Sequence, residues 1–237
     1  MLVRTQAIVL RRIRYSDSSI IATVLTPEYG VESILAKGAR TAKSRVAGIL
    51  QPLEHTELQY YAKPGRQLHL LGSAERMVLR QRLHSSYDHT LAGLAMLETV
   101  LRLELPGHPA DAVFALLADA LAALDAAEAN VAAFPVAFAF RFAAAHGFRL
   151  SAPRADLLSD SVFAVDTGHL LPASANQTHG VALDAETAQT LLALATVPFS
   201  AIPMLELSSE AVVACQELAA LFLAFHFERP VRRRQTF

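Results

Sequence analysis

The residue types in this sequence that could bind a ligand through charge are cations gathered in one short loop. Residues 36–45 read Ala-Lys-Gly-Ala-Arg-Thr-Ala-Lys-Ser-Arg, with no carboxylate among them. Lys and Arg side chains at this density can contact successive phosphates, and Ser44 and the backbone at Gly38 can donate further hydrogen bonds to phosphate oxygens. The loop therefore predicts a polyanion-binding surface that includes Lys37, Arg40, Lys43 and Arg45.

A second group of cations follows the apolar run of residues 6–10, and it consists of Arg11, Arg12 and Arg14. We expect these side chains to join the loop cations in one binding surface. The alternative is that some of the cations pair with carboxylates, for which the candidates are Glu28, Glu32 and Glu54. In that case the positive charge would be neutralised within the protein.

The overall net charge of −1 hides an asymmetry between the two parts of the chain. Residues 1–80 hold 12 Lys and Arg against 6 Asp and Glu, a balance of +6, whereas residues 81–237 hold 9 against 16, a balance of −7. Such asymmetry favours a polyanion partner for the first part. The second part ends in a basic tail, residues 229–234, for which a further polyanion contact and a solubilising role are both open.

The common catalytic motifs do not occur in the sequence, which holds no phosphate-binding or dinucleotide-binding glycine pattern, no nucleophile elbow and no zinc-protease helix. Its single cysteine, Cys215, excludes an intramolecular disulfide and a cysteine metal cluster, and its apolar neighbours predict a buried side chain. We therefore predict no metal, no cofactor and no enzymatic activity. The enzyme alternative is a nuclease built on Asp156, Asp160 and Asp166, but their loose spacing favours turn and capping roles.

Apolar periodicity divides the chain into a strand-rich and a helix-rich part. The first 80 residues predict strands at 6–10, 20–25, 31–36, 53–61 and 67–78, and five strands in this length suit a small closed barrel. From residue 83 the period becomes helical, which predicts helices at 88–104, 110–126, 131–146, 184–195 and 208–227. The last helix is apolar nearly all round, so we expect it to lie centrally in a bundle. An irregular region, residues 149–182, holds a predicted hairpin at 162–171.

The predicted fold class is therefore α+β, with a small N-terminal β-barrel over residues 1–80. Residues 81–237 are expected to form a mostly α-helical bundle with a small β-hairpin insertion. The longest apolar stretch without charge, residues 131–140, is about half a membrane span. Because no signal peptide fits the N-terminal residues either, we expect a cytoplasmic protein with no membrane partner.

Several short segments match one family closely: residues 7–11, 26–30, 36–40, 43–45 and 50–53, with weaker matches at 138–148 and 223–234. Through them the sequence resembles the RecO family of bacterial recombination mediators. The resemblance implies an N-terminal OB-fold that binds single- and double-stranded DNA. It also implies annealing of complementary strands and help in loading recombinase onto strands coated by single-strand-binding protein, in RecF-pathway repair.

The partners that the resemblance implies are RecR, the C-terminal tail of single-strand-binding protein, and RecF, with a cytoplasmic location at the nucleoid. Many family members carry a four-cysteine zinc site after the helix that ends here at Gly147. This sequence has no cysteine in that region, so a zinc site of that type is excluded. We expect the hairpin at 162–171 to be held by its own packing instead.

The aromatic residues of the first 80 positions indicate how DNA would be bound. They contain no Phe and no Trp, and their aromatics are Tyr15, Tyr29, Tyr60 and Tyr61. With few rings available for stacking, binding should depend on phosphate contacts more than on base identity. This mode suits an annealing protein, which must leave base edges free to pair.

A possible protein-binding site is centred on Arg141, a single cation between Phe138 and Phe142 on an apolar helix. A cation at an aromatic pocket would complement an acidic tail that ends in a hydrophobic residue. The alternative is an arginine that extends from a core helix to solvent or pairs with a carboxylate. For the whole protein, the alternative to a DNA-binding mediator is a non-catalytic adaptor whose helical domain is the main binding surface.

Overall fold

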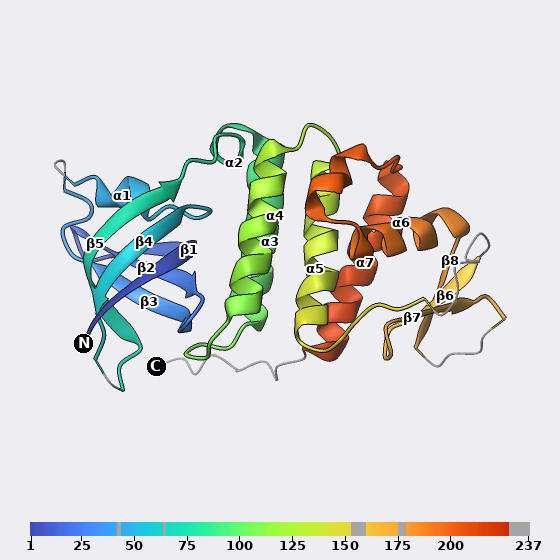
Figure 1. Ribbon diagram of the computed structural model, residues 1–237, viewed down its shortest axis with the longest axis horizontal. Helices are drawn as coiled ribbons and strands as arrows, with labels where there is room; N and C mark the ends of the chain where they lie inside the picture. Colours follow the sequence, from blue (N-terminus) through green and yellow to red (C-terminus); the bar gives the residue numbers. More distant parts are fainter. Residues whose placement is uncertain (42–43, 64, 153–159, 175–178, 228–237) are drawn as a thin grey trace. The chain divides into compact units, whose positions relative to one another are not determined.

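Five strands close into an OB-like barrel in the computed structural model (Figure 1). The structure describes residues 1–41, 44–63, 65–152, 160–174 and 179–227. The strands are β1 (Leu2–Tyr15), β2 (Ser19–Thr26), β3 (Gly30–Ala36), β4 (His55–Tyr61) and β5 (Leu68–Val78). Their order around the barrel is β1-β2-β3-β5-β4, with β1 closing onto β4. All pairs are antiparallel except β3 with β5.

The barrel interior is filled by every second residue of each strand, as the pleat of a strand requires. In β4, for example, Leu58 and Tyr60 are fully buried, whereas Tyr61 is 52% exposed. The interior residues form one cluster that includes Val9, Ala22 and Ile34. The predicted strands and the mixed α+β class are therefore confirmed, and β1 is longer at both ends than predicted.

Contacts between residues divide the chain into two compact units. The first comprises residues 1–138 and 198–205, and the second comprises residues 139–197 and 206–237. The barrel and the helices that follow it fall in the same unit. The division predicted after residue 80 stays a prediction.

Helices of the first unit cover part of the barrel's outer surface. They are α1 (Val46–Ile49), α2 (Arg82–Ser85), α3 (Tyr87–Leu103), α4 (Asp111–Ala126) and the 3-10 turns η1 (Val131–Ala133) and η2 (Phe199–Met204). Helix α3 contacts β1, and α4 contacts β2. Ile8, Leu10 and Leu25 are accordingly buried although they lie outside the interior cluster.

The second unit combines helices with a small sheet. Its helices are α6 (Ala185–Thr196), α7 (Ser209–His226) and the greater part of α5 (Phe134–Ala145). Helix α5 ends in a Schellman motif, since Gly147 has φ +94° and Phe148 N–H donates to Ala143 C=O at 2.9 Å. Strands β6 (Ser161–Ala164), β7 (His169–Pro172) and β8 (Gly180–Leu183) pair in the order β7-β6-β8.

The predicted hairpin is confirmed as β6 and β7, and its core is aromatic. Phe163 of β6 is fully buried and lies against Phe140 and Phe222, with ring centroids 6.1 and 5.6 Å away. His226 adds a ring nitrogen 2.9 Å from the carbonyl oxygen of Val165. These contacts account for the stability of the small sheet through packing.

The predicted central position of α7 is wrong. One face of the helix is buried through residues such as Cys215 and Phe222, but Val213, Leu221 and Phe225 are 45–52% exposed. Helix α7 is also the one helix of the described residues that is long and apolar enough to cross a membrane, with a mean hydropathy of 1.2. Packing in the second unit, including contacts with α6, accounts for the apolar residues of its buried face.

A buried histidine should make the stability of the first unit depend on pH. The ring of His55 meets Phe114 edge-on, and Nε2 lies 3.2 Å from Gln6 Oε1. Burial, and next the charge of Arg80, lower the pKa of His55 from 6.5 to about 4. Between these values the unfolded chain binds a proton that the folded protein does not, so stability falls as pH falls from 6.5 to 4.

We expect the variant His55→Gln to lose free energy of unfolding less steeply over this pH range than the wild type, measured by urea denaturation. The exposed histidine variant His108→Gln is the control, and it should keep the wild-type dependence. If the free energy of unfolding of His55→Gln depends on pH as in wild type, another titratable group causes the loss of stability at acid pH.

Candidate nucleic-acid interface

The basic loop after β3 is fixed against the turn between β1 and β2. Gly38 has φ +67°, and its carbonyl oxygen accepts hydrogen bonds from the backbone and side chain of Thr41. Arg40 N–H donates to Ser18 C=O at 2.9 Å, which joins the loop to that turn. Lys37, Arg40 and Arg45 are exposed on this loop, whereas Lys43 lies outside the described residues.

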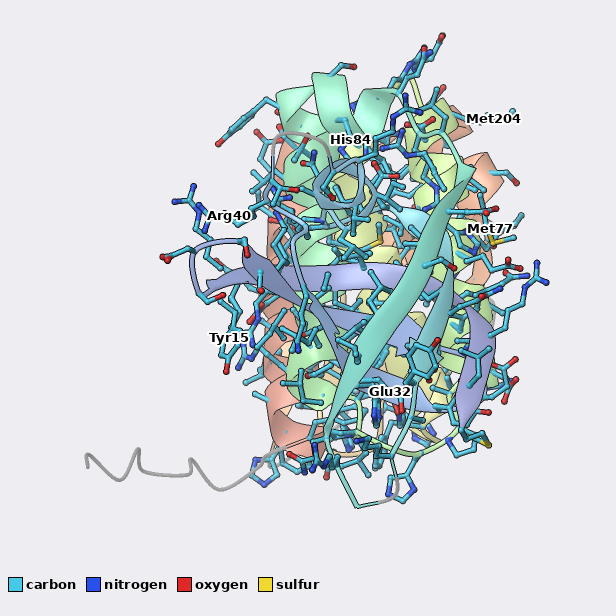
Figure 2. The ribbon with its side chains drawn as sticks, turned by 90° about the vertical axis from the view of Figure 1, so that its left-hand side faces the viewer. Tyr15, Glu32, Arg40, Met77, His84 and Met204 are labelled. Atoms are coloured by element: carbon cyan, nitrogen blue, oxygen red, sulfur yellow. The ribbon has the colours of Figure 1, made fainter. Side chains whose placement is uncertain are left out.

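One hollow of about 440 Å³ is lined by three of the cations that the sequence predicts to bind a polyanion. Arg12 and Arg14 come from β1, Arg40 comes from the basic loop, and Ile13, Ile20 and Ala47 complete the lining. The guanidinium of Arg12 donates to Ala47 C=O at 2.7 Å, and that of Arg40 donates to Ser16 C=O at 3.3 Å. Figure 2 shows Arg40 and Tyr15 on the same side of the barrel. The fold therefore brings two separate cationic segments to one place.

Arg11 does not share the face of Arg12 and Arg14. Arg12 pairs with Ala22, and Arg14 pairs with Ile20, both of which face the barrel interior along β2. Arg11 pairs instead with Thr23, on the outer face, after a bulge between Val9 and Arg11. Side chains along a strand point alternately to its two faces. The β1 arginines therefore form two sets, Arg11 on one face and Arg12 with Arg14 on the other.

The alternative in which these cations pair with nearby carboxylates is wrong for the described residues. Glu28 accepts a hydrogen bond from Thr5, and Glu32 accepts one from Tyr60 and lies 3.3 Å from His69. Glu54 is occupied by Arg76. Within the described ranges, no ion pair to a carboxylate is formed by Arg11, Arg12, Arg14, Lys37, Arg40 or Arg45. Their charge stays available to a polyanion.

Glu54 is a buried anchor beneath this surface. Only 4% of its side chain is exposed, and its two oxygens each accept a hydrogen bond of 2.7 Å from the fork of Arg76. Arg76 also donates to Gly48 C=O at 3.1 Å, which attaches helix α1 to β5. Ala47 of that helix lines the hollow, so the pair helps to place one wall.

The four tyrosines of the barrel differ in what they offer a ligand. Tyr15 and Tyr61 are about half exposed, and Tyr29 is partly buried against the interior cluster. Tyr60 is fully buried, and burial together with its hydrogen bond to Glu32 raises the pKa of its hydroxyl. Two rings are therefore accessible for stacking.

The candidate protein-binding residues on α5 are largely enclosed. Phe138 and Phe142 are fully buried. Arg141 is partly buried, and its guanidinium lies 3.4 Å from Leu194 C=O. This environment favours the packing interpretation over an open aromatic pocket.

The remaining candidates are the basic tail, three aspartates after α5, and Cys215. The basic tail, residues 229–234, and Asp156 lie outside the described residues. Asp160 is exposed, and Asp166 lies in the turn between β6 and β7. Within the described residues no three His, Cys, Asp or Glu side chains gather in a way that could hold a metal ion. For Cys215, burial raises the pKa of the thiol to about 12, in keeping with a core residue.

Comparison with known families identifies the chain. Residues 1–78 match the family description Recombination protein O N terminal, and residues 84–235 match Recombination protein O C terminal. The chain belongs to the RecO family. The first RecO match ends at the last residue of β5, and the second begins within α2.

Relatives of the chain carry the name DNA repair protein RecO. The one from Salinibacter ruber is 39% identical over 130 residues, and the match spans 55% of this chain and 50% of that protein. The one from Chlorobaculum parvum is 42% identical over 74 residues, which are 31% of this chain and 28% of the relative. The one from Chlorobium limicola is 26% identical over 254 aligned residues, which cover 99% and 96% of the two chains.

Removing the charge of Glu54 should destabilise the barrel of this RecO family member. We expect Glu54→Gln to lower the free energy of unfolding by about 2–3 kcal/mol, because a buried, two-pronged ion pair is lost. Urea denaturation followed by circular dichroism measures this change. The matched control is Glu57→Gln, whose pair with Arg4 is exposed and should contribute little. Equal effects of the two substitutions would contradict the anchoring role of Glu54.

Proposed function

We propose that this protein is a DNA repair protein that binds DNA through its barrel, anneals complementary strands and helps to load recombinase onto strands coated by single-strand-binding protein. Membership of the RecO family and the names of its relatives support the assignment to DNA repair. The observation that carries the DNA-binding role is the hollow lined by Arg12, Arg14 and Arg40, whose charges no described carboxylate neutralises.

The proposed DNA surface comprises the cations of β1 and of the basic loop: Arg11, Arg12, Arg14, Lys37, Arg40, Lys43 and Arg45. The closed barrel supports this proposal, because OB-folds bind oligonucleotides across a face and its loops. Arginine and lysine contact phosphates without reading sequence. A strand held by its phosphates leaves base edges free, which annealing requires.

The proposed partners are single- and double-stranded DNA, RecR, the C-terminal tail of single-strand-binding protein and RecF, in the cytoplasm and at the nucleoid. We propose no catalytic role. Arg141, with Phe138 and Phe142, stays the candidate for the tail, although the burial of both rings leaves little more than the arginine to contact it.

Binding through phosphates predicts a steep dependence on salt. If four to six cations neutralise phosphates, log K against log salt should slope by about −3 to −4 for a single-stranded oligonucleotide. The double variant Arg14→Gln/Lys37→Gln should reduce the magnitude of the slope by about 1.5. Fluorescence anisotropy at several salt concentrations measures it. Arg4→Gln is the control, since Arg4 already pairs with Glu57, and a nearly flat wild-type dependence would contradict the proposal.

An annealing assay with complementary oligonucleotides tests the function itself. We expect the triple variant Lys37→Ala/Arg40→Ala/Lys43→Ala to anneal more slowly than wild type by on the order of tenfold, because three phosphate contacts are lost. If wild type and the triple variant anneal at equal rates, the basic loop does not take part in annealing. A wild-type protein that neither binds nor anneals DNA would favour the adaptor alternative.

A further inference from the structure

Helix α7 exposes apolar residues on the side that does not pack in the second unit. Val213, Leu221 and Phe225 are each about half exposed. A helix that packs by one side only normally carries polar residues on the other side. The buried side of α7 faces α6, where the thiol of Cys215 donates to Thr187 C=O at 3.7 Å. Packing against α6 therefore does not explain the exposed apolar residues.

The exposed residues of α7 lie along one face of the helix. They are three or four positions apart, which is the spacing of neighbours on a helix surface. The face is about 18 Å long, or about three helical turns. Two alanines lie between larger side chains, so the backbone of a partner helix can approach closely there. The outer face of α7 consists of Val213, Glu217, Ala220, Leu221, Ala224 and Phe225.

Aromatic rings form the C-terminal end of this outer face. The ring centroid of Phe225 lies 5.6 Å from that of the exposed His179 and 5.1 Å from that of His226. Leu221 lies one helical turn before Phe225. Aromatic side chains are enriched in the cores of protein interfaces. This end of α7 therefore provides the apolar anchors of a binding surface.

The charge around the outer face is negative. Residues 184–227 contain no Lys and no Arg, but they contain five carboxylates. Of these, Glu210 lies one turn before Val213, and Glu217 lies within the outer face. Both side chains are exposed, and neither forms an ion pair with any residue that the structure describes. Their charge is therefore available to a basic partner.

We infer that the outer face of α7 binds an amphipathic helix of a partner protein, with apolar residues along one side and Lys or Arg beside them. The apolar side of that helix packs on Leu221 and Phe225, and its cations lie near Glu210 and Glu217. This surface goes beyond the proposed function, and its partner is opposite in charge to the acidic tail considered at Arg141.

Two other classes of partner do not fit this charge. Nucleic acids bind through Lys and Arg that neutralise phosphates. Helices that lie on membranes likewise carry Lys and Arg on their polar side. The face offers neither class a cation, because residues 184–227 hold none of these two residue types.

A labelled synthetic helix of about 18 residues, with Leu at every third or fourth position and Lys elsewhere, tests the inference. Fluorescence anisotropy measures its binding to the full-length protein. The variant Leu221→Gln/Phe225→Gln should bind this peptide roughly tenfold more weakly than wild type, because its apolar anchors are removed. Wild type should bind a peptide with Glu in place of each Lys at least about tenfold more weakly.

Leu91→Gln/Leu94→Gln is the matched control, because it removes two exposed leucines from α3 instead, and it should bind the Lys peptide as wild type does. Circular dichroism of each variant establishes that it is folded. Equal binding of the Lys peptide by wild type and Leu221→Gln/Phe225→Gln would overturn the inference, as would equal binding of the Lys and Glu peptides by wild type.

Three further measurements test the other occupants of the face. A wild-type dimer in sedimentation velocity that Leu221→Gln/Phe225→Gln cannot form would assign the face to a second copy of the chain. Binding of wild type, but not of this variant, to phosphatidylglycerol vesicles would assign it to a membrane. A tenfold gain in peptide affinity on replacing Arg232, Arg233 and Arg234 by Gln would assign it to the chain's own basic tail. Each of these results would overturn the inference.

Discussion

The pairing of β3 with β5 is the interaction on which the barrel depends. It covers three residue pairs, and it is the parallel contact in a barrel whose other strand pairs are antiparallel. Two of these pairs lie on opposite faces of the barrel wall. Ile34 enters the interior, beside His69, whose ring stacks on Tyr60. Leu35 and Leu70 lie on the outer face of the barrel. Closure thus completes the core and holds β3 beside β5.

Closure also determines where the negative charge of the barrel is held. Glu32 is turned toward Tyr60 and His69, and Glu54 is enclosed with Arg76. Carboxylates removed from the surface in this way cannot neutralise cations at the end of the β1–β2 hairpin. The barrel therefore presents a more positive surface than its composition alone would give, since the carboxylates are occupied within the fold.

Much of this organisation could be predicted from local patterns. Alternation predicted the five strands, and the period of apolar residues predicted the longer helices to within a few residues. Local chemistry also accounts for the ends of two helices. Ser208 accepts a hydrogen bond from Ala211 N–H at the start of α7, and Gly147 adopts the left-handed conformation after α5.

Features that depend on distant contacts could not be predicted in the same way. A run of charges usually ends a half-buried strand, yet Arg11 to Arg14 continue β1, because β2 pairs with them. Helix α1 has four residues, and its anchor, Glu54, binds a residue 22 positions away. The cationic hollow is equally hidden, since Arg12 and Arg40 lie in separate segments and only the fold brings them together.

The length of β1 has a consequence for the edge of the barrel. Residues 2–8 of β1 pair with β4, whereas residues 11–15 pair with β2 and have no β4 partner. Along these residues β1 is an open edge, while β2 pairs on its other side with β3. Arg11 lies on one face of this edge and Arg12 and Arg14 lie on the other, so positive charge opposes its pairing with a strand of another protein chain.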